Sequence, residues 1–188
     1  MANHNLKPLT ALGHDAPVEI EIGPYRIVER IDVALASLAI RRGCNDAFLK
    51  AAKSAKLPLA DISRVQSGTV YHSFWLSSEL WMVEAPFASH EDIRAHLKQI
   101  FSETASITEQ TDAWVRLDIT ATHLQPLFER LCNQDVAAAP IGFATRTMID
   151  HLGCYLIKRT AHDVTLYGPR SSAKSLLHAV EGAAQSVI

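Results

Sequence analysis

Cysteine is scarce in this sequence. The 188 residues include three, Cys44, Cys132 and Cys154, which are widely spaced and form no Cys-x-x-Cys pair. An odd number at such spacing argues against a disulfide framework and against a zinc site. We therefore expect three reduced thiols.

Histidine pairs with metal-binding spacing are also missing. No two of the nine histidines stand four residues apart, as two metal ligands on one face of a helix would. His90 and His96 stand six residues apart, which would place them on different sides of one helix. We expect no metal site in this chain.

Long apolar runs and an excess of one charge are absent too. No apolar run reaches the roughly 18 to 20 residues that a membrane span needs. The net charge of −2 provides no basic surface for nucleic acid. The segment 1–17 is polar and lacks the apolar core of a signal peptide. We expect a cytoplasmic protein with neither a membrane nor a nucleic-acid partner.

Signatures of common active sites do not occur either. The sequence contains no G-x-G-x-x-G, no P-loop and no G-x-S-x-G elbow. Asp118, between a strand and a helix, could act as a general base, but a carboxylate that stabilises the turn is the favoured interpretation. Asp150 and His151 are adjacent in a strand pattern and would point to opposite faces. We expect no catalytic residue and no cofactor-binding residue in this chain.

What the sequence does contain is a regular series of strands and helices. Alternating or β-branched segments predict strands at 18–23, 33–42, 68–77, 79–86, 114–120, 145–159 and 163–169. The second pair of these, 68–77 and 79–86, predicts a hairpin, and 145–159 predicts one long strand bent at Gly153. Helices are predicted at 45–57, 89–103, 121–135 and 171–184, with caps at Asn45 or Asp46, Ser89, Thr122 and Ser171 or Ser172.

The order of these elements repeats along the chain. Pro86 and Pro169 each end a strand and precede a serine-containing helix start, and they stand 83 residues apart. The repeat predicts an α+β fold built from two βαββα halves, about 18–105 and 112–188, whose sheets are covered by helices. The two halves would form one domain, 18–188, preceded by an extended N-terminal arm, 1–17.

Two sets of apolar side chains suit an interface with another protein. The arm carries Leu6, Leu9 and Leu12 between prolines and polar residues, so it must dock on something to be ordered. Trp75 and Trp81 in the predicted hairpin would serve equally well in an interface or in the core of the sheet.

The segment Gly168–Ser172 raises a separate question, because a Gly-Pro turn, Arg170 and two serines precede a helix. The matching segment of the first half has the same shape but no arginine, which favours a helix start over a ligand site. The alternative is that Arg170 pairs with a carboxylate of a partner chain.

The whole chain from about residue 6 resembles the gamma subunit family of heterotetrameric sarcosine oxidase. The resemblance rests on "LKPLTALG", "FWLSSELWMVEAP", "WVRLDITATHLQPLFERLCNQDV", "ATRTMIDHLGCYLIKR" and "VTLYGPRSSAKSLLHAV" in that order. That family is similar in turn to the N-terminal domain of folate-binding aminomethyltransferases, which agrees with the βαββα repeat.

The resemblance implies a non-catalytic subunit that stabilises an assembly of alpha, beta and delta partners. The other subunits would carry FAD, covalent FMN, NAD, tetrahydrofolate and zinc, and this chain no cofactor. The complex would oxidise sarcosine to glycine, with hydrogen peroxide and formaldehyde or methylene-tetrahydrofolate as products.

Two alternatives remain open from the sequence. The gamma subunit of N-methylglutamate dehydrogenase is similar, and a non-catalytic chain cannot indicate the substrate. A free folate-binding or one-carbon transfer protein would need a carboxylate facing a pocket, with Asp118 or Asp150 as candidates. Against it, "HLGCYLIKR" departs from the Lys-Gly-Cys-x-x-Gly-Gln pattern of folate-dependent relatives.

Overall fold

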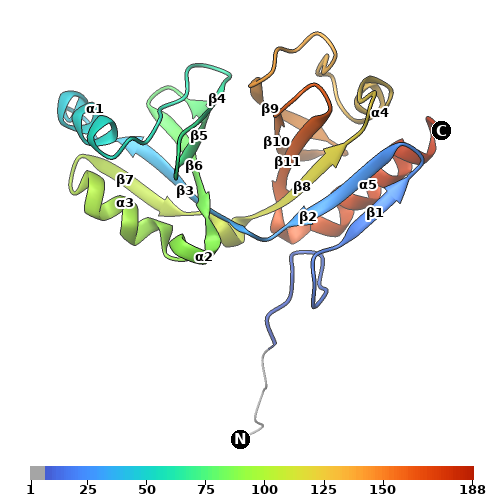
Figure 1. The fold of residues 1–188 in the computed structure, drawn as a ribbon, viewed down its shortest axis with the longest axis horizontal. Coiled ribbons are helices and arrows are strands. Elements are labelled where there is room, and N and C mark those ends of the chain that lie inside the picture. The colour runs from blue at the N-terminus through green and yellow to red at the C-terminus, as the bar shows by residue number, and fades with distance from the viewer. Residues whose placement is uncertain (1–6) are drawn as a thin grey trace, which may run out of the picture.

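The structure is a computed structural model that describes residues 7–188, and its strands form two antiparallel sheets (Figure 1). The five-stranded sheet has the order β4-β5-β6-β3-β7, with β3 (Val33–Ile40), β4 (Val65–Ser67), β5 (His72–Ser77), β6 (Leu80–Pro86) and β7 (Ala105–Glu109). The six-stranded sheet has the order β1-β2-β8-β11-β10-β9, with β1 (Glu19–Ile22), β2 (Tyr25–Arg30), β8 (Trp114–Thr120), β9 (Ala144–Ile149), β10 (Leu152–Lys158) and β11 (Asp163–Pro169).

Helices cover the outer faces of the two sheets, and the inner faces meet (Figure 1). The five-stranded sheet is covered by α1 (Asn45–Ser54), α2 (Phe87–His90) and α3 (Ile93–Phe101), and the six-stranded sheet by α4 (Gln125–Leu131) and α5 (Ala173–Gln185). Because side chains alternate between faces along a strand, each sheet contributes one row to a helix-covered core and one row to the inter-sheet core. The expected α+β class with helix-covered sheets is confirmed.

The two halves repeat, but their boundaries differ from the expected ones. The series β3, α1, β4, β5, β6, α3 corresponds in order and pairing to β8, α4, β9, β10, β11, α5. In the first half β7 pairs with β3, whereas in the second half β2 from the N-terminus pairs with β8. The expected boundaries of 18–105 and 112–188 are therefore corrected: residues 19–30 belong to the second half.

Two equivalent turns join the sheets at the β4 and β9 edge. In each turn a backbone N–H donates three residues back, from Arg64 to Asp61 and from Phe143 to Pro140, both at 3.0 Å. Val65 N then donates to Gly142 O at 2.8 Å, and Ala144 N donates to Ser63 O at 2.9 Å. These reciprocal bonds close the inter-sheet core along this edge.

The segment 145–159 is not the predicted bent strand. Its ladder breaks at Asp150 and His151, which have φ of 45° and 66° and turn β9 into β10. Two successive residues with positive φ make a two-residue hairpin turn. The prediction failed because this turn normally carries Asn-Gly or Asp-Gly, and here His occupies the second position.

Most of the predicted helix caps are also wrong. Asp92, not Ser89, caps α3 by accepting from Ala95 N at 2.9 Å. The side chains of Thr122 and Ser172 make no cap hydrogen bond, and α4 begins at Gln125. A break between α2 and α3 lets the rings of His90 and His96 approach to 4.6 Å between centroids, although one continuous helix would separate them.

Three strands escaped the sequence analysis, namely β2, β4 and β7. Each is short. The strand β2 follows Gly23-Pro24, a pair that favours the end of a strand over the start of a new one. Within residues 7–188 no helix has both the length and the apolar character to cross a bilayer.

Candidate functional site

A network of charged side chains lies between the two sheets. It joins Glu84 on β6 to inward-facing residues of the six-stranded sheet: Arg116, Asp118, Arg159, Thr165 and Tyr167. Alternation along β8 and β11 places this row inside, because Leu117 and Leu166 between them face the helices. Strand register brings Arg116 beside Tyr167 and Asp118 beside Thr165.

Glu84 is the buried centre of this network, since its side chain is 4% exposed. The two terminal nitrogens of Arg159 donate to the two carboxylate oxygens of Glu84, with Nη1 at 3.1 Å from Oε2. The Tyr167 hydroxyl donates to Oε1 of the same carboxylate. Arg116 Nη1 adds an ion pair with Oε1 at 3.7 Å. One carboxylate of the first half thus binds three side chains of the second.

Arg116 and Asp118 extend the network along β8. Arg116 donates through Nε and Nη2 to the two oxygens of Asp118, both at 2.9 Å. The Thr165 hydroxyl donates to Asp118 Oδ1 at 2.7 Å and accepts from Arg159 Nε at 3.1 Å. The four charges, two positive and two negative, are paired and hydrogen-bonded, which is the condition for burying them.

Burial and pairing change the pKa values within this network. Burial acts to raise the pKa of Glu84, but Arg159 and Arg116 outweigh it and hold that pKa below its ordinary value. Burial, reinforced by the Glu84 charge, raises the pKa of Tyr167 well above 10. Burial opposes the charge of Arg116, but Tyr167, Asp118 and Glu84 raise its pKa overall. The Glu84 carboxylate and the Arg116 guanidinium therefore stay charged, and the Tyr167 phenol stays neutral, at physiological pH.

The interior offers no free acid, base or nucleophile. Among the described residues, every buried side-chain nitrogen or oxygen has a hydrogen-bond partner. Buried Lys158 donates to the carbonyl oxygens of Val136 and Ala139, both at 2.7 Å. Burial raises the pKa of the Cys154 thiol to about 11, which makes it a poor nucleophile at neutral pH.

The sequence candidates Asp118 and Asp150 do not come together. Asp118 lies within β8 and is held by Arg116 and Thr165 rather than by backbone N–H groups in a turn, so the expected turn-stabilising carboxylate is corrected. Asp150 lies in the exposed β9–β10 turn. Within residues 7–188 no three histidine, cysteine, aspartate or glutamate side chains gather as a metal site would require.

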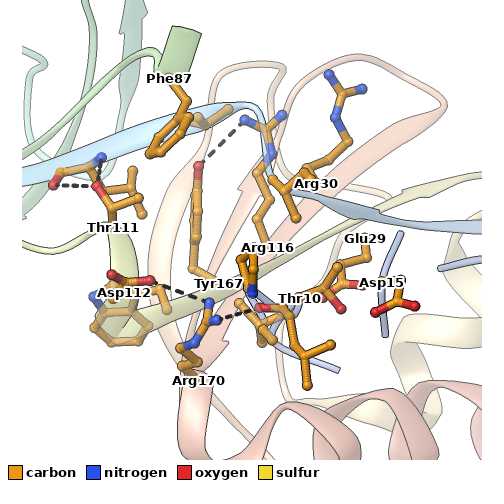
Figure 2. Close-up of a pocket in the computed structure, with 18 residues that line it drawn as sticks. Thr10, Asp15, Glu29, Arg30, Phe87, Thr111, Asp112, Arg116, Tyr167 and Arg170 are labelled. Atoms are coloured by element: carbon orange, nitrogen blue, oxygen red, sulfur yellow. Dashed lines mark hydrogen bonds and ion pairs between the residues drawn. The ribbon is translucent and has the colours of Figure 1, made fainter. Parts of the chain in front are cut away.

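A pocket of about 360 Å³ lies beside the network, between the two halves and the arm. Figure 2 shows Tyr167 and Arg116 at its centre, with Arg170 between Asp112 and the arm residue Thr10. Arg170 Nη2 donates to the Leu9 carbonyl at 3.1 Å, and Nη1 lies 3.6 Å from Asp112 Oδ1. In this structure Arg170 therefore contacts a carbonyl and a carboxylate of its own chain.

The N-terminal arm docks on its own domain. The buried Glu29 carboxylate accepts from Leu12 N at 3.1 Å and from Val18 N at 3.2 Å. Leu12 is 2% exposed and packs in the core of the second half, so its expected role in an interface with a partner is corrected. Leu9 is 49% exposed and remains accessible, whereas Leu6 lies outside the described residues.

The two tryptophans of the hairpin are only partly buried. Trp75 and Trp81 face each other across β5 and β6. Trp81 donates its indole N–H to the Ala60 carbonyl at 2.8 Å and stacks on Phe48 with ring centroids 5.8 Å apart. Trp81 therefore borders the helix-covered core of the first half, and its role in an interface stays a prediction.

Sequence reasoning missed both the network and an exposed apolar pair. Glu84 and Tyr167 stand 83 residues apart, the same separation as Pro86 and Pro169, so the repeat could have paired them. Ile62 and Ile141 are 74% and 62% exposed in the two turns that join the sheets. Both turns follow the pattern Ala-x-Ile, which was the available signal.

Known proteins match this chain in fold rather than in sequence. No protein-family model and no curated protein matches the sequence. A chain of heterotetrameric sarcosine oxidase from Corynebacterium sp. U-96 matches with a TM-score of 0.74 and 12% identity, over 90% of this chain and 88% of that one. Aminomethyltransferase T of the glycine cleavage system from Bartonella henselae matches with a TM-score of 0.61 and 13% identity, over 84% of this chain and 45% of that one. The expected likeness to both groups is confirmed, and at these identities it shows that the chain has their fold.

Proposed function

We propose that this chain is a non-catalytic gamma-type subunit of a heterotetrameric sarcosine oxidase. The observation that carries the proposal is the reciprocal match with a chain of such an oxidase, over 90% of this chain and 88% of that chain. The match with aminomethyltransferase T covers 45% of that enzyme. The match to the oxidase chain therefore supports the proposal more than the match to part of the aminomethyltransferase does.

The paired interior supports a structural role. A catalytic site normally keeps a titratable group free and tuned for its task, whereas Glu84, Asp118, Arg116 and Arg159 are bonded to one another. The network fixes the two halves relative to each other, so it provides a rigid body that larger subunits can assemble on.

In the proposed complex the alpha, beta and delta subunits are the partners. They would carry FAD, covalent FMN, NAD, tetrahydrofolate and zinc, while this chain holds none of them. The reaction would convert sarcosine to glycine with hydrogen peroxide and either formaldehyde or methylene-tetrahydrofolate. This chain contributes by stabilising the alpha and beta assembly.

The exposed surface offers candidate contacts for these partners. Ile62 and Ile141 project from adjacent turns, and Leu9 projects from the docked arm. Large side chains exposed in pairs are typical of protein interfaces when they form a continuous patch. We place the first contact at the paired turns.

A free folate-binding protein is less well supported. Tetrahydrofolate would need unpaired polar groups for its ring, and the interior carboxylates Glu84 and Asp118 already use their oxygens for Arg159, Tyr167, Arg116 and Thr165. These residues do not fit the group. The gamma subunit of N-methylglutamate dehydrogenase remains the second candidate, because a structural subunit carries no substrate contacts.

The test is purification of the tagged chain from its native host. We expect two larger chains, one small chain and flavin absorbance near about 450 nm to co-purify at constant ratio, as an obligate complex would. Turnover with sarcosine rather than N-methylglutamate would identify the enzyme. A colourless single chain would contradict the proposal, and saturable tetrahydrofolate binding by that chain would favour the folate alternative.

A further inference from the structure

We propose that the pocket between the arm and the two halves binds a small organic acid with an apolar body, with Arg170 holding its carboxylate. The site borders the buried network, whose Arg116 and Tyr167 line it, and is independent of the proposed assembly. Its volume of about 360 Å³ is at the lower end of the range for small-molecule pockets. A ligand of the size of a phenyl-substituted acid would fit inside it.

The walls of the pocket are mostly apolar and come from the arm, β3, β8 and α2. Leu9 belongs to the arm, Val33 and Leu35 to β3, and Trp114 to the start of β8. Phe87 projects from the opposite side (Figure 2). Such walls favour the body of an apolar ligand, because its burial removes hydrocarbon surface from water.

Three arginines line the pocket, and two of them are already neutralised. Arg30 pairs with both oxygens of Asp32, and Arg116 pairs with both oxygens of Asp118. Arg170 differs, because its direct hydrogen bond goes to the neutral Leu9 carbonyl through Nη2. Its Nη1 has only Asp112, at 3.6 Å, among the described residues.

The contact with Asp112 is weak enough to be exchanged. The Asp112 side chain is 87% exposed, so water screens its attraction for Arg170. A ligand carboxylate at Nη1 would form a shorter, charge-assisted hydrogen bond, while Nη2 keeps its bond to Leu9. The arm therefore fixes the guanidinium and leaves one edge of it to face the pocket.

The acidic residues of the lining do not cancel this preference. The two carboxylate oxygens of Glu29 accept hydrogen bonds from the backbone N–H groups of Leu12 and Val18. Asp15 forms an ion pair with Lys7 at 2.7 Å. Asp112 is the acidic residue that contacts Nη1 of Arg170, the atom that the ligand carboxylate would contact. It competes for Arg170, so removing its charge should strengthen binding.

The experiment uses the full chain and phenylacetate, with neutral phenylacetamide as the matched probe. Trp114 lines the pocket and donates its indole N–H to Gln110, while Trp75 and Trp81 lie outside it. The indole signals of the ¹⁵N-labelled protein, assigned by single Trp→Phe variants, then report on the site and on two internal references. We expect saturable movement of the Trp114 signal with phenylacetate and at least about tenfold weaker binding of phenylacetamide.

Three variants separate binding from folding. R170Q should weaken phenylacetate binding about tenfold and D112N should strengthen it a few-fold, with unchanged thermal unfolding of D112N because that side chain is exposed. R170K should lie between the wild type and R170Q, because it keeps the charge without the planar edge. A purely structural Arg170 predicts no such opposite effects.

The proposal is overturned if phenylacetate leaves the Trp114 signal unchanged, or if acid and amide bind equally. It is also overturned if D112N weakens binding. Loss of assembly in R170Q without any binding of phenylacetate would assign Arg170 to a carboxylate of a partner chain instead. Failure of the proposed oxidase assembly would leave the phenylacetate result untouched.

Discussion

Glu84 and Tyr167 occupy equivalent positions in the two halves and are joined by a hydrogen bond across the sheets, 83 residues apart in the chain. The hydrogen bond therefore joins two residues that the internal repeat relates to each other. On one side of it Arg159 binds the carboxylate, and on the other Arg116 lies under the phenol, 5.9 Å from the ring centroid. The halves are therefore joined by charge as well as by apolar packing.

Removing the Glu84 charge should cost stability well beyond an ordinary surface mutation. E84Q leaves Arg159 and Arg116 buried beside a neutral amide, and breaking a buried pair in this way costs about 3 to 5 kcal/mol. The measurement is the free energy of unfolding in urea. E103Q is the matched control, because exposed Glu103 also contacts two cations, Arg41 and Lys98, and water screens both contacts, so this change should cost far less stability than E84Q. Equal effects would refute the structural role of the network.

Alkaline pH should destabilise the chain through Tyr167. Its folded pKa lies well above 10 because of burial and the Glu84 charge, whereas in the unfolded chain it is about 10. The folded state holds the proton more tightly, so the contribution is complete below about pH 10 and is lost as pH rises through the folded pKa. Y167F should therefore flatten the fall of unfolding free energy above that pH.

Y155F serves as the control for this pH effect. Burial raises the pKa of Tyr155 as well, but no carboxylate contributes, so its removal should keep more of the alkaline slope. If the unfolding free energy of Y167F fell with alkaline pH as steeply as that of the wild type, another titrating group would dominate the pH dependence in that range.

The two leucines of the arm should behave oppositely. L12A opens a cavity in the core of the second half and should cost about 2 to 5 kcal/mol of unfolding free energy. L9A removes an exposed side chain and should cost no more than about 0.5 kcal/mol. If L12A left stability unchanged, the arm would not be docked in solution.

The paired isoleucine turns give a test of the assembly. In the proposed complex, replacing both Ile62 and Ile141 with lysine should lower co-purification of the larger chains at least about tenfold, because two charges would have to be desolvated at the contact. Stability should stay within about 0.5 kcal/mol of the wild type. L49K on the outer face of α1, at a leucine 51% exposed, is the control and should leave co-purification intact.

The hairpin turn between β9 and β10 is a site for stabilisation. Asp150 and His151 both have positive φ, which costs a non-glycine residue roughly 1 kcal/mol or more. H151G should raise the unfolding free energy by about 1 kcal/mol, since glycine accepts this conformation without strain. A lower midpoint in urea would mean that the His151 side chain makes a favourable contact.

Much of the fold could be predicted from the spacing of apolar residues and from the turn-forming residues that interrupt apolar runs. The β3–α1 joint was found because Gly43 and Asn45 interrupt an apolar run, and β8 because polar and apolar residues alternate from Trp114 to Thr120. The same alternation kept the sequence analysis from identifying the charged network between the sheets. Arg116 and Asp118 look like a solvent-facing row, and only the second sheet, packed over them, turns that row into an interior one.

What failed in the prediction depended on partners distant in sequence. The strand β2 pairs locally with β1 across Gly23-Pro24, but its place inside the sheet depends on pairing with β8, about ninety residues later. Likewise Leu12 is buried by residues of the second half that the arm's own sequence does not specify. Arg170 was recognised as unusual, but its contact with Leu9 spans 161 residues.

The placement of β2 in the second sheet has a consequence for how the chain is made on the ribosome. Residues 33–109 contain all strands of the five-stranded sheet, so this sheet can be completed before β8 has been synthesised. The β1–β2 hairpin emerges earlier still, but a two-stranded hairpin is marginal alone, and its partner β8 does not exist until residue 120 has been added. The strands β1 and β2 therefore keep an unpaired edge until β8 of the second half has been synthesised. Any chaperone that acts on this protein during translation would find an unpaired strand edge near the N-terminus while the second half is still being synthesised.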